Sequence, residues 1–180
     1  MTKLPLTLAL MSTAALAACG SMMAPKVDNA ALPEAVRVPA GHTQSLYAMA
    51  SGEITYECRE KKDTAGSFEW AFVGPVATMV DAGGKNLGRY HAGPTWESTD
   101  GSKVTGKQVA VAPAAAGAIP LQLVKANPAT GNGAMQGVAY IQRLNTRGGV
   151  APALPCGDAQ KGQRQVVSYS ADYVFYKPGM

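Results

Sequence analysis

The sequence predicts an all-β fold, a single-domain sandwich or barrel of about ten short, mostly antiparallel strands. Glycine and proline, with 20 and 12 copies in 180 residues, favour many turns between short elements. Apolar side chains recur at every second position in most segments, which is the period of a half-buried strand. Beyond the N-terminal apolar stretch, no segment sustains the three- and four-residue spacing of an amphipathic helix.

The expected strands follow one another at the spacing that is typical of sandwiches and barrels. In chain order they cover residues 43–51, 53–59, 68–73, 77–80, 86–91, 95–98, 103–111, 119–126, 134–145 and 165–176. Ser51-Gly52 predicts a hairpin turn, and Gly74-Pro75 predicts a break between two strands. On the last strand, one face is expected to carry Val167, Tyr169, Ala171, Tyr173 and Phe175.

Residues 1–18 have the pattern of a bacterial lipoprotein signal peptide. Lys3 supplies a positive charge, and Leu4 to Leu16 is an apolar stretch too short to span a membrane. Leu16-Ala17-Ala18-Cys19 then resembles a lipobox. Cys19 would carry the diacylglycerol and palmitate chains, which together anchor a protein stably. The alternative is an ordinary signal peptidase site that leaves Cys19 as a free thiol.

The lipoprotein interpretation also predicts the domain organisation and the location. Residues 19–38 would form the lipidated N-terminus and a tether, and residues 39–177 the all-β domain. Gly20 differs from the aspartate that retains lipoproteins in the inner membrane. We therefore expect an outer-membrane lipoprotein that faces the periplasm or the cell surface.

Charge is sparse and scattered along the chain. Charged residues make up 16% of the sequence, and the net charge is +4. A nucleic-acid-binding protein would show a basic stripe, so we expect no nucleic-acid partner. The 47% hydrophobic content excludes a disordered chain.

Two cysteines remain once Cys19 is assigned to the lipid. In an oxidising compartment, Cys58 and Cys156 are expected to form a disulfide, with Cα atoms about 4.4–6.8 Å apart. A zinc site that adds His42 and His91 is the less favoured alternative, because no close cysteine or histidine pair supports it. We expect no metal and no cofactor.

Ordered motifs over most of the chain resemble a known family. They are Tyr56-Glu57-Cys58, Phe72 to Pro75, His91 to Glu97, Tyr140 to Thr146, Gly148-Gly149 and Ala171-Asp172-Tyr173. Together they resemble secreted bacterial and fungal proteins catalogued as domain of unknown function 3455. The resemblance implies export and one compact domain, and it implies no particular activity.

Side chains that can bind or react are densest around Gly93-Pro94. The candidate binding or catalytic residues there are Arg89, Tyr90, His91, Trp96 and Glu97. Aromatic faces beside polar groups suit a glycan or another small ligand. The structural alternative places Trp96 in the core and pairs Glu97 with Arg89 or Arg143.

Two further candidates come from neighbouring strands. Arg143 alternates with Asn145 and Arg147, so the three are expected on one face, and Asp172 belongs to the last strand. A glycosidase would need a second carboxylate near Glu97, such as Asp100 or Asp172.

Binding or envelope structure is the favoured role, with the membrane as a partner through the lipid anchor. The alternative is a hydrolase acting on envelope or extracellular carbohydrate, centred on His91 and Glu97. Neither a serine nucleophile motif nor a complete phosphate-binding loop is present.

The lipid anchor makes the first testable prediction. Cys19→Ala removes the thiol that diacylation requires, so acyl labelling should disappear and the protein should move from the membrane fraction to the soluble fraction. Metabolic labelling with an acyl probe measures this directly. Labelling that persists in the Cys19→Ala protein would contradict the interpretation.

Overall fold

The computed structural model describes residues 24–179. The predicted signal peptide and Cys19 lie outside the described residues. In the part that is described, no helix is long and apolar enough to cross a membrane.

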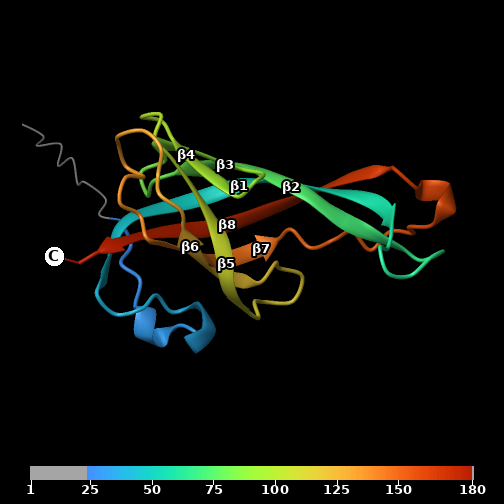
Figure 1. Ribbon diagram of the computed structural model, residues 1–180, viewed down its shortest axis with the longest axis horizontal. Helices are drawn as coiled ribbons and strands as arrows, with labels where there is room; N and C mark the ends of the chain where they lie inside the picture. The colour runs from blue at the N-terminus through green and yellow to red at the C-terminus, as the bar shows by residue number, and fades with distance from the viewer. Residues whose placement is uncertain (1–23, 180) are drawn as a thin grey trace, which may run out of the picture.

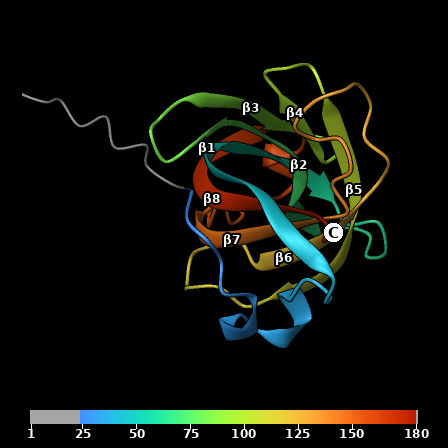
Figure 2. The same ribbon diagram turned by 90° about the vertical axis from the view of Figure 1, so that its left-hand side faces the viewer.

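Eight antiparallel strands form one closed barrel in which each strand pairs with the next and β8 pairs with β1 (Figures 1 and 2). The strands are β1 (His42–Glu60), β2 (Phe68–Val80), β3 (Asn86–His91), β4 (Thr95–Ser98), β5 (Lys103–Ala112), β6 (Leu121–Ala126), β7 (Tyr140–Gly148) and β8 (Arg164–Pro178). Three short 3₁₀ helices complete the described chain: η1 (Asn29–Ala31), η2 (Glu34–Val36) and η3 (Asp158–Gln160). The all-β prediction is confirmed, with fewer and longer strands than expected.

The predicted hairpin at Ser51-Gly52 is wrong, because β1 is one strand of 19 residues. Gly52 pairs with Ala77 on one side and with Tyr169 on the other. A Cβ atom at Gly52 would lie 2.1 Å from the carbonyl oxygen of Val76. Gly52 therefore permits the close approach of β2 to β1, which a residue with a side chain would prevent.

The predicted break at Gly74-Pro75 is also absent, because both residues lie within β2. A bulge occurs opposite Thr55 and Tyr56, where the pairing of β1 with β2 shifts by one residue. Pro75 directly precedes Val76, the first residue of β2 that pairs with β3. The preceding part of β2, residues 68–75, pairs with β1 alone and is an edge strand, a position at which proline is tolerated.

Three strands continue past the barrel and form an arm, at the right of Figure 1. The arm consists of residues 54–60 of β1, 68–75 of β2 and 164–168 of β8. The loop 149–163 lies against it, and the Cys58–Cys156 disulfide joins the two, with the Cα atoms 5.6 Å apart. The predicted disulfide is confirmed, and with both sulfurs bonded to each other the zinc alternative is excluded.

The barrel interior is packed with aromatic side chains. Trp96 is fully buried, and its ring centroid lies 4.8 Å from that of Tyr90 and 5.6 Å from that of Tyr173. The predicted face of β8 does point inward, since Tyr169, Ala171, Tyr173 and Phe175 belong to the same core.

A second apolar cluster lies outside the barrel. Val36, at the end of η2, packs with Leu123, Leu144 and Val174 on the outer surface. Gln142 is fully buried there and donates a hydrogen bond of 2.6 Å to the Val36 carbonyl oxygen. The described part of the expected tether, residues 24–38, therefore lies against the barrel.

The disulfide closes a loop of 98 residues in sequence, so its loss should destabilise the domain. In the chain-entropy account, a loop of this length contributes about 4–5 kcal/mol by restricting the unfolded chain. We expect a Cys58→Ala, Cys156→Ala double variant to unfold at a much lower denaturant concentration, measured by intrinsic fluorescence. An exposed-site control, Ser51→Ala, should leave the midpoint unchanged. A double variant as stable as the wild type would contradict this account.

Candidate functional site

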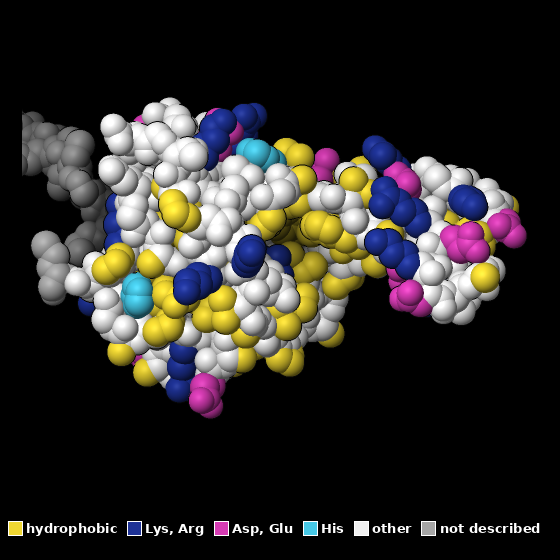
Figure 3. Space-filling view, viewed as in Figure 1, with side chains coloured by type: hydrophobic (Ala, Val, Ile, Leu, Met, Phe, Trp, Pro, Cys, Tyr) yellow, Lys and Arg dark blue, Asp and Glu magenta, His cyan; other side chains and the backbone are white. Residues whose placement is uncertain are grey.

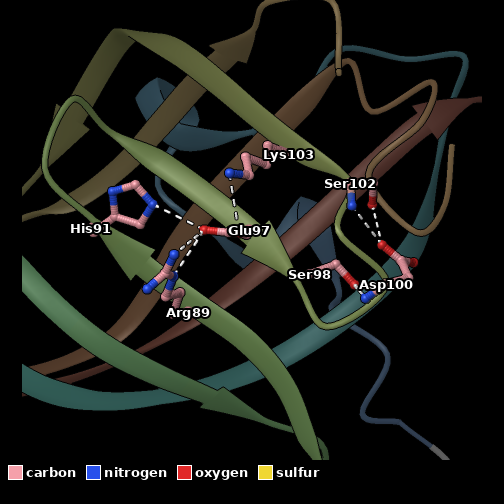
Figure 4. A network of polar contacts seen from close by, with 7 residues as sticks. All are labelled: Arg89, His91, Glu97, Ser98, Asp100, Ser102 and Lys103. Carbon is pink, nitrogen blue, oxygen red and sulfur yellow. Dashed lines mark hydrogen bonds and ion pairs between the residues drawn. The ribbon is translucent and has the colours of Figure 1, made fainter. Parts of the chain in front are cut away.

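The residues that the sequence singled out divide between the two faces of the β3–β4 hairpin. Tyr90 pairs with Trp96, and both side chains point into the barrel. Arg89 pairs with Glu97, and these two lie with His91 on the outer face (Figure 4). Strand alternation therefore separates the aromatic side chains from the charged ones.

Glu97 is the centre of the outer cluster. It accepts hydrogen bonds of 2.9 and 2.7 Å from Arg89, and Lys103 Nζ lies 3.1 Å from its Oε1. His91 Nε2 lies 3.5 Å from Oε2. The hydrogen bonds from Arg89 and Lys103 lower the pKa of Glu97 below 4.5, so the carboxylate is ionised at neutral pH. A carboxylate held in this way is a poor general acid.

The two other carboxylates considered for a glycosidase are also engaged. Asp100 accepts hydrogen bonds from the amide and hydroxyl of Ser102 (Figure 4) and also from the amide of Ala134. These bonds lower the pKa of Asp100. Asp172 accepts bonds of 2.6 Å from the Tyr47 hydroxyl and from Asn145. Each carboxylate thus has its own set of donors.

Arg143 does not share a face of β7 with Asn145 and Arg147. Asn145 has a φ of 49°, and the pairing of β7 with β8 shifts between Leu144 and Arg147. This bulge breaks the alternation of side chains. Arg143 lines a cavity at the barrel mouth, whereas Asn145 and Arg147 line a separate, more open pocket with Asp172. The expectation of one shared face is wrong for this reason.

A cavity of about 390 Å³ opens at the end of the barrel where the arm begins. Figure 3 shows it as a hollow bordered by hydrophobic side chains between the barrel and the arm. Its apolar wall includes Ile54, Phe72, Pro75, Pro94, Ile119 and Val124. Its polar groups are Tyr56, Tyr90, Gln108, Gln122 and Arg143. Pockets for small ligands usually have this composition, with a few polar groups in an apolar wall.

The polar groups of the cavity are held in place by the loops around it. Arg143 donates from Nε and Nη2 to the Pro120 carbonyl oxygen, over 3.2 and 2.9 Å. The Tyr56 hydroxyl donates to the Gly149 carbonyl oxygen over 2.7 Å. Gln122 donates to Gln108 over 2.5 Å, which joins the neighbouring strands β6 and β5 at the mouth.

Tyr90 lines the cavity on the side of the barrel core, and other buried tyrosines stand behind it. The ring of Tyr173 lies 4.9 Å from that of Tyr90. The buried hydroxyls of Tyr169 and Tyr173 lie behind this ring, close to each other and outside the cavity lining. Burial raises the pKa of Tyr169 to about 12, so its hydroxyl stays protonated at neutral pH.

The cavity unites only two of the seven candidate binding residues, Tyr90 and Arg143. Sequence reasoning missed Tyr56, Gln108 and Gln122, which come from three other strands. Strict alternation around Tyr90 and Trp96 was the available signal that Arg89, His91 and Glu97 face outward. In residues 24–179, no group of three or more His, Cys, Asp or Glu side chains is placed to hold a metal ion.

These features define an up-and-down antiparallel barrel with a cavity at one mouth. Residues 39–177 match the family described as Protein of unknown function (DUF3455), and the chain belongs to that family. The resemblance drawn from the sequence motifs is thereby confirmed. Comparison with curated proteins and with solved structures finds no match.

The outer cluster makes a pH-dependent prediction. Because the folded protein lowers the Glu97 pKa below the ordinary 4.5, the stabilisation is present above 4.5 and is lost as the pH falls through the folded value. We expect Glu97→Gln to melt below the wild type at neutral pH, and this difference to vanish in acid. Calorimetric melting across this range measures it. Glu69→Gln, at an exposed carboxylate that forms no ion pair in the described chain, should show no comparable difference. A Glu97→Gln penalty that grows toward acid pH would contradict the assignment.

Proposed function

We propose that this protein is a binding module that holds one small, mostly apolar ligand in the mouth of its barrel. The observation that carries the proposal is the cavity of about 390 Å³, whose apolar wall surrounds a few fixed polar groups. An eight-stranded barrel is wide enough either to be filled by side chains or to hold one small ligand. Here Trp96 and Phe175 fill one part of the interior, and smaller side chains such as Val124 border the cavity.

The cavity is also placed suitably for an anchored protein. We infer from the lipobox that Cys19 tethers the domain to the outer membrane. The first described residues and the C-terminus lie at the end of the barrel opposite the arm (Figure 1). The mouth beside the arm would then face away from the membrane, toward ligand in the periplasm or outside the cell.

The hydrolase alternative receives less support. His91 and Glu97 belong to the outer face and are not among the residues that line the mouth cavity. Glu97 is also committed to Arg89 and Lys103. A retaining or inverting glycosidase requires one carboxyl group that stays protonated to act as an acid, and the ion pairs favour the opposite state.

A neutral aromatic probe of suitable size tests the binding function. With about 13 non-hydrogen atoms at about −0.3 kcal/mol each, 2-naphthamide should bind with a Kd near or below about 1 mM. We expect the purified lipoprotein in detergent micelles to bind it, measured by fluorescence anisotropy. Gln108→Trp should block the mouth and abolish that binding.

A matched control separates the cavity from the micelle. Lys107→Trp places the same ring on the neighbouring exposed position of β5, outside the cavity lining, and should bind as the wild type does. Melting temperatures confirm that both variants fold. Equal anisotropy for wild type and a folded Gln108→Trp protein would overturn the proposal.

A further inference from the structure

We propose that the ligand of the barrel mouth is an anion, a small carboxylic acid with an aromatic or alicyclic body, and that Arg143 binds its carboxylate. This inference rests on the proposed function and names the class of ligand. It follows from the charge of the cavity, from the free donors of the guanidinium and from the polar and apolar groups that line the rest of the cavity.

Arg143 introduces a positive charge that the cavity does not balance. It is the one charged residue in the lining, and no salt bridge to it is found within residues 24–179. Arg89 pairs with Glu97 and Arg164 with Glu57, whereas Arg143 shares the lack of a carboxylate partner in residues 24–179 with the surface residues Arg37 and Arg147. Arg143 differs from those two because it lines a cavity. A ligand carboxylate that entered the cavity would therefore meet a cation with no competing carboxylate beside it.

The guanidinium is fixed and still has donors to offer. Both of its hydrogen bonds end on the Pro120 carbonyl oxygen and use Nε and Nη2. Arginine carries five N–H donors in a planar fork, so the remaining donors are free to meet the two oxygens of a carboxylate. Because the Pro120 contact already orients the side chain, binding a carboxylate requires little further ordering.

The polar groups near Arg143 suit an acceptor better than a donor. Its charge reaches the hydroxyls of Tyr56, Tyr90 and Tyr173, where it opposes the rise in pKa caused by burial. Burial is the larger effect on each hydroxyl, so all three stay protonated at neutral pH. The Tyr56 proton is donated to Gly149, so Tyr90 is the hydroxyl of the lining that can donate to a ligand. The lining contains no carboxylate that would attract a cationic ligand or repel an anion.

The rest of the lining selects the body of the ligand. Phe72 is 57% exposed at the mouth, and its ring meets that of Tyr56 edge-on at 6.1 Å. Pro75 and Pro94 add rigid apolar surface beside it. A flat ring would cover this surface and remove it from water, which is the source of affinity for the uncharged part.

A pair of probes that differ only in charge tests the inference. The probes are 2-naphthoate and 2-naphthamide, which share one ring system. We expect the wild-type lipoprotein to bind 2-naphthoate at least about tenfold more tightly, which corresponds to about 1.4 kcal/mol. The preference should weaken with added salt, because a charge pair is screened.

Variants at two arginines assign that preference to one side chain. Arg143→Gln should lose the preference for naphthoate and still bind naphthamide, which shows that the cavity is intact. Arg143→Lys should restore part of the preference, since it keeps the charge without the fork. Arg147→Gln removes an exposed arginine outside the cavity lining and should behave as the wild type does.

The outcomes distinguish the two proposals. If neither probe binds to the wild type, the binding function itself fails. Equal affinity for the two probes, or a preference that survives in a folded Arg143→Gln protein, would overturn the anion inference and leave the binding function standing.

Discussion

The pairing of β1 with β8 is the interaction on which the rest of the structure depends. It runs from His42 opposite Pro178 to Glu57 opposite Arg164, and it joins segments more than a hundred residues apart in the chain. This pairing closes the barrel, which leaves no open sheet edge within it. It also continues past the barrel, so the same two strands that enclose the core support the arm beside the mouth.

Local pattern was enough to predict the class of fold and the inward face of β8, and the count of cysteines in an exported chain was enough to predict the disulfide. Period two is a property of neighbouring residues, and it placed Tyr169, Ala171, Tyr173 and Phe175 together correctly. The role of Gly52 was not visible in the same way. Whether a glycine turns the chain or admits a neighbouring strand depends on what packs against it, and Val76 lies 24 positions further along.

The candidate site was predicted only in part for the same physical reason. Tyr90 and Arg143 meet in one cavity because barrel closure brings β3 and β7 to the same mouth. The charged residues around Gly93-Pro94 are close in sequence, yet alternation sends Glu97 outward and Trp96 inward. The segment from Arg89 to Glu97 therefore has two separate roles: its charged side chains form a surface ion cluster, and its aromatic side chains pack in the core.

The unbroken path of β1 from the barrel into the arm has a mechanical consequence. A domain joined by a flexible loop can rotate about that loop, but a hydrogen-bonded ribbon of three strands resists bending along its whole length. The bulge beside Thr55 and Tyr56 sets the direction in which the ribbon leaves the barrel without interrupting it. Phe72 and Pro75 therefore keep their position at the mouth, because the strand that carries them is held by the hydrogen bonds of the sheet. A ligand would bind against a rigid wall.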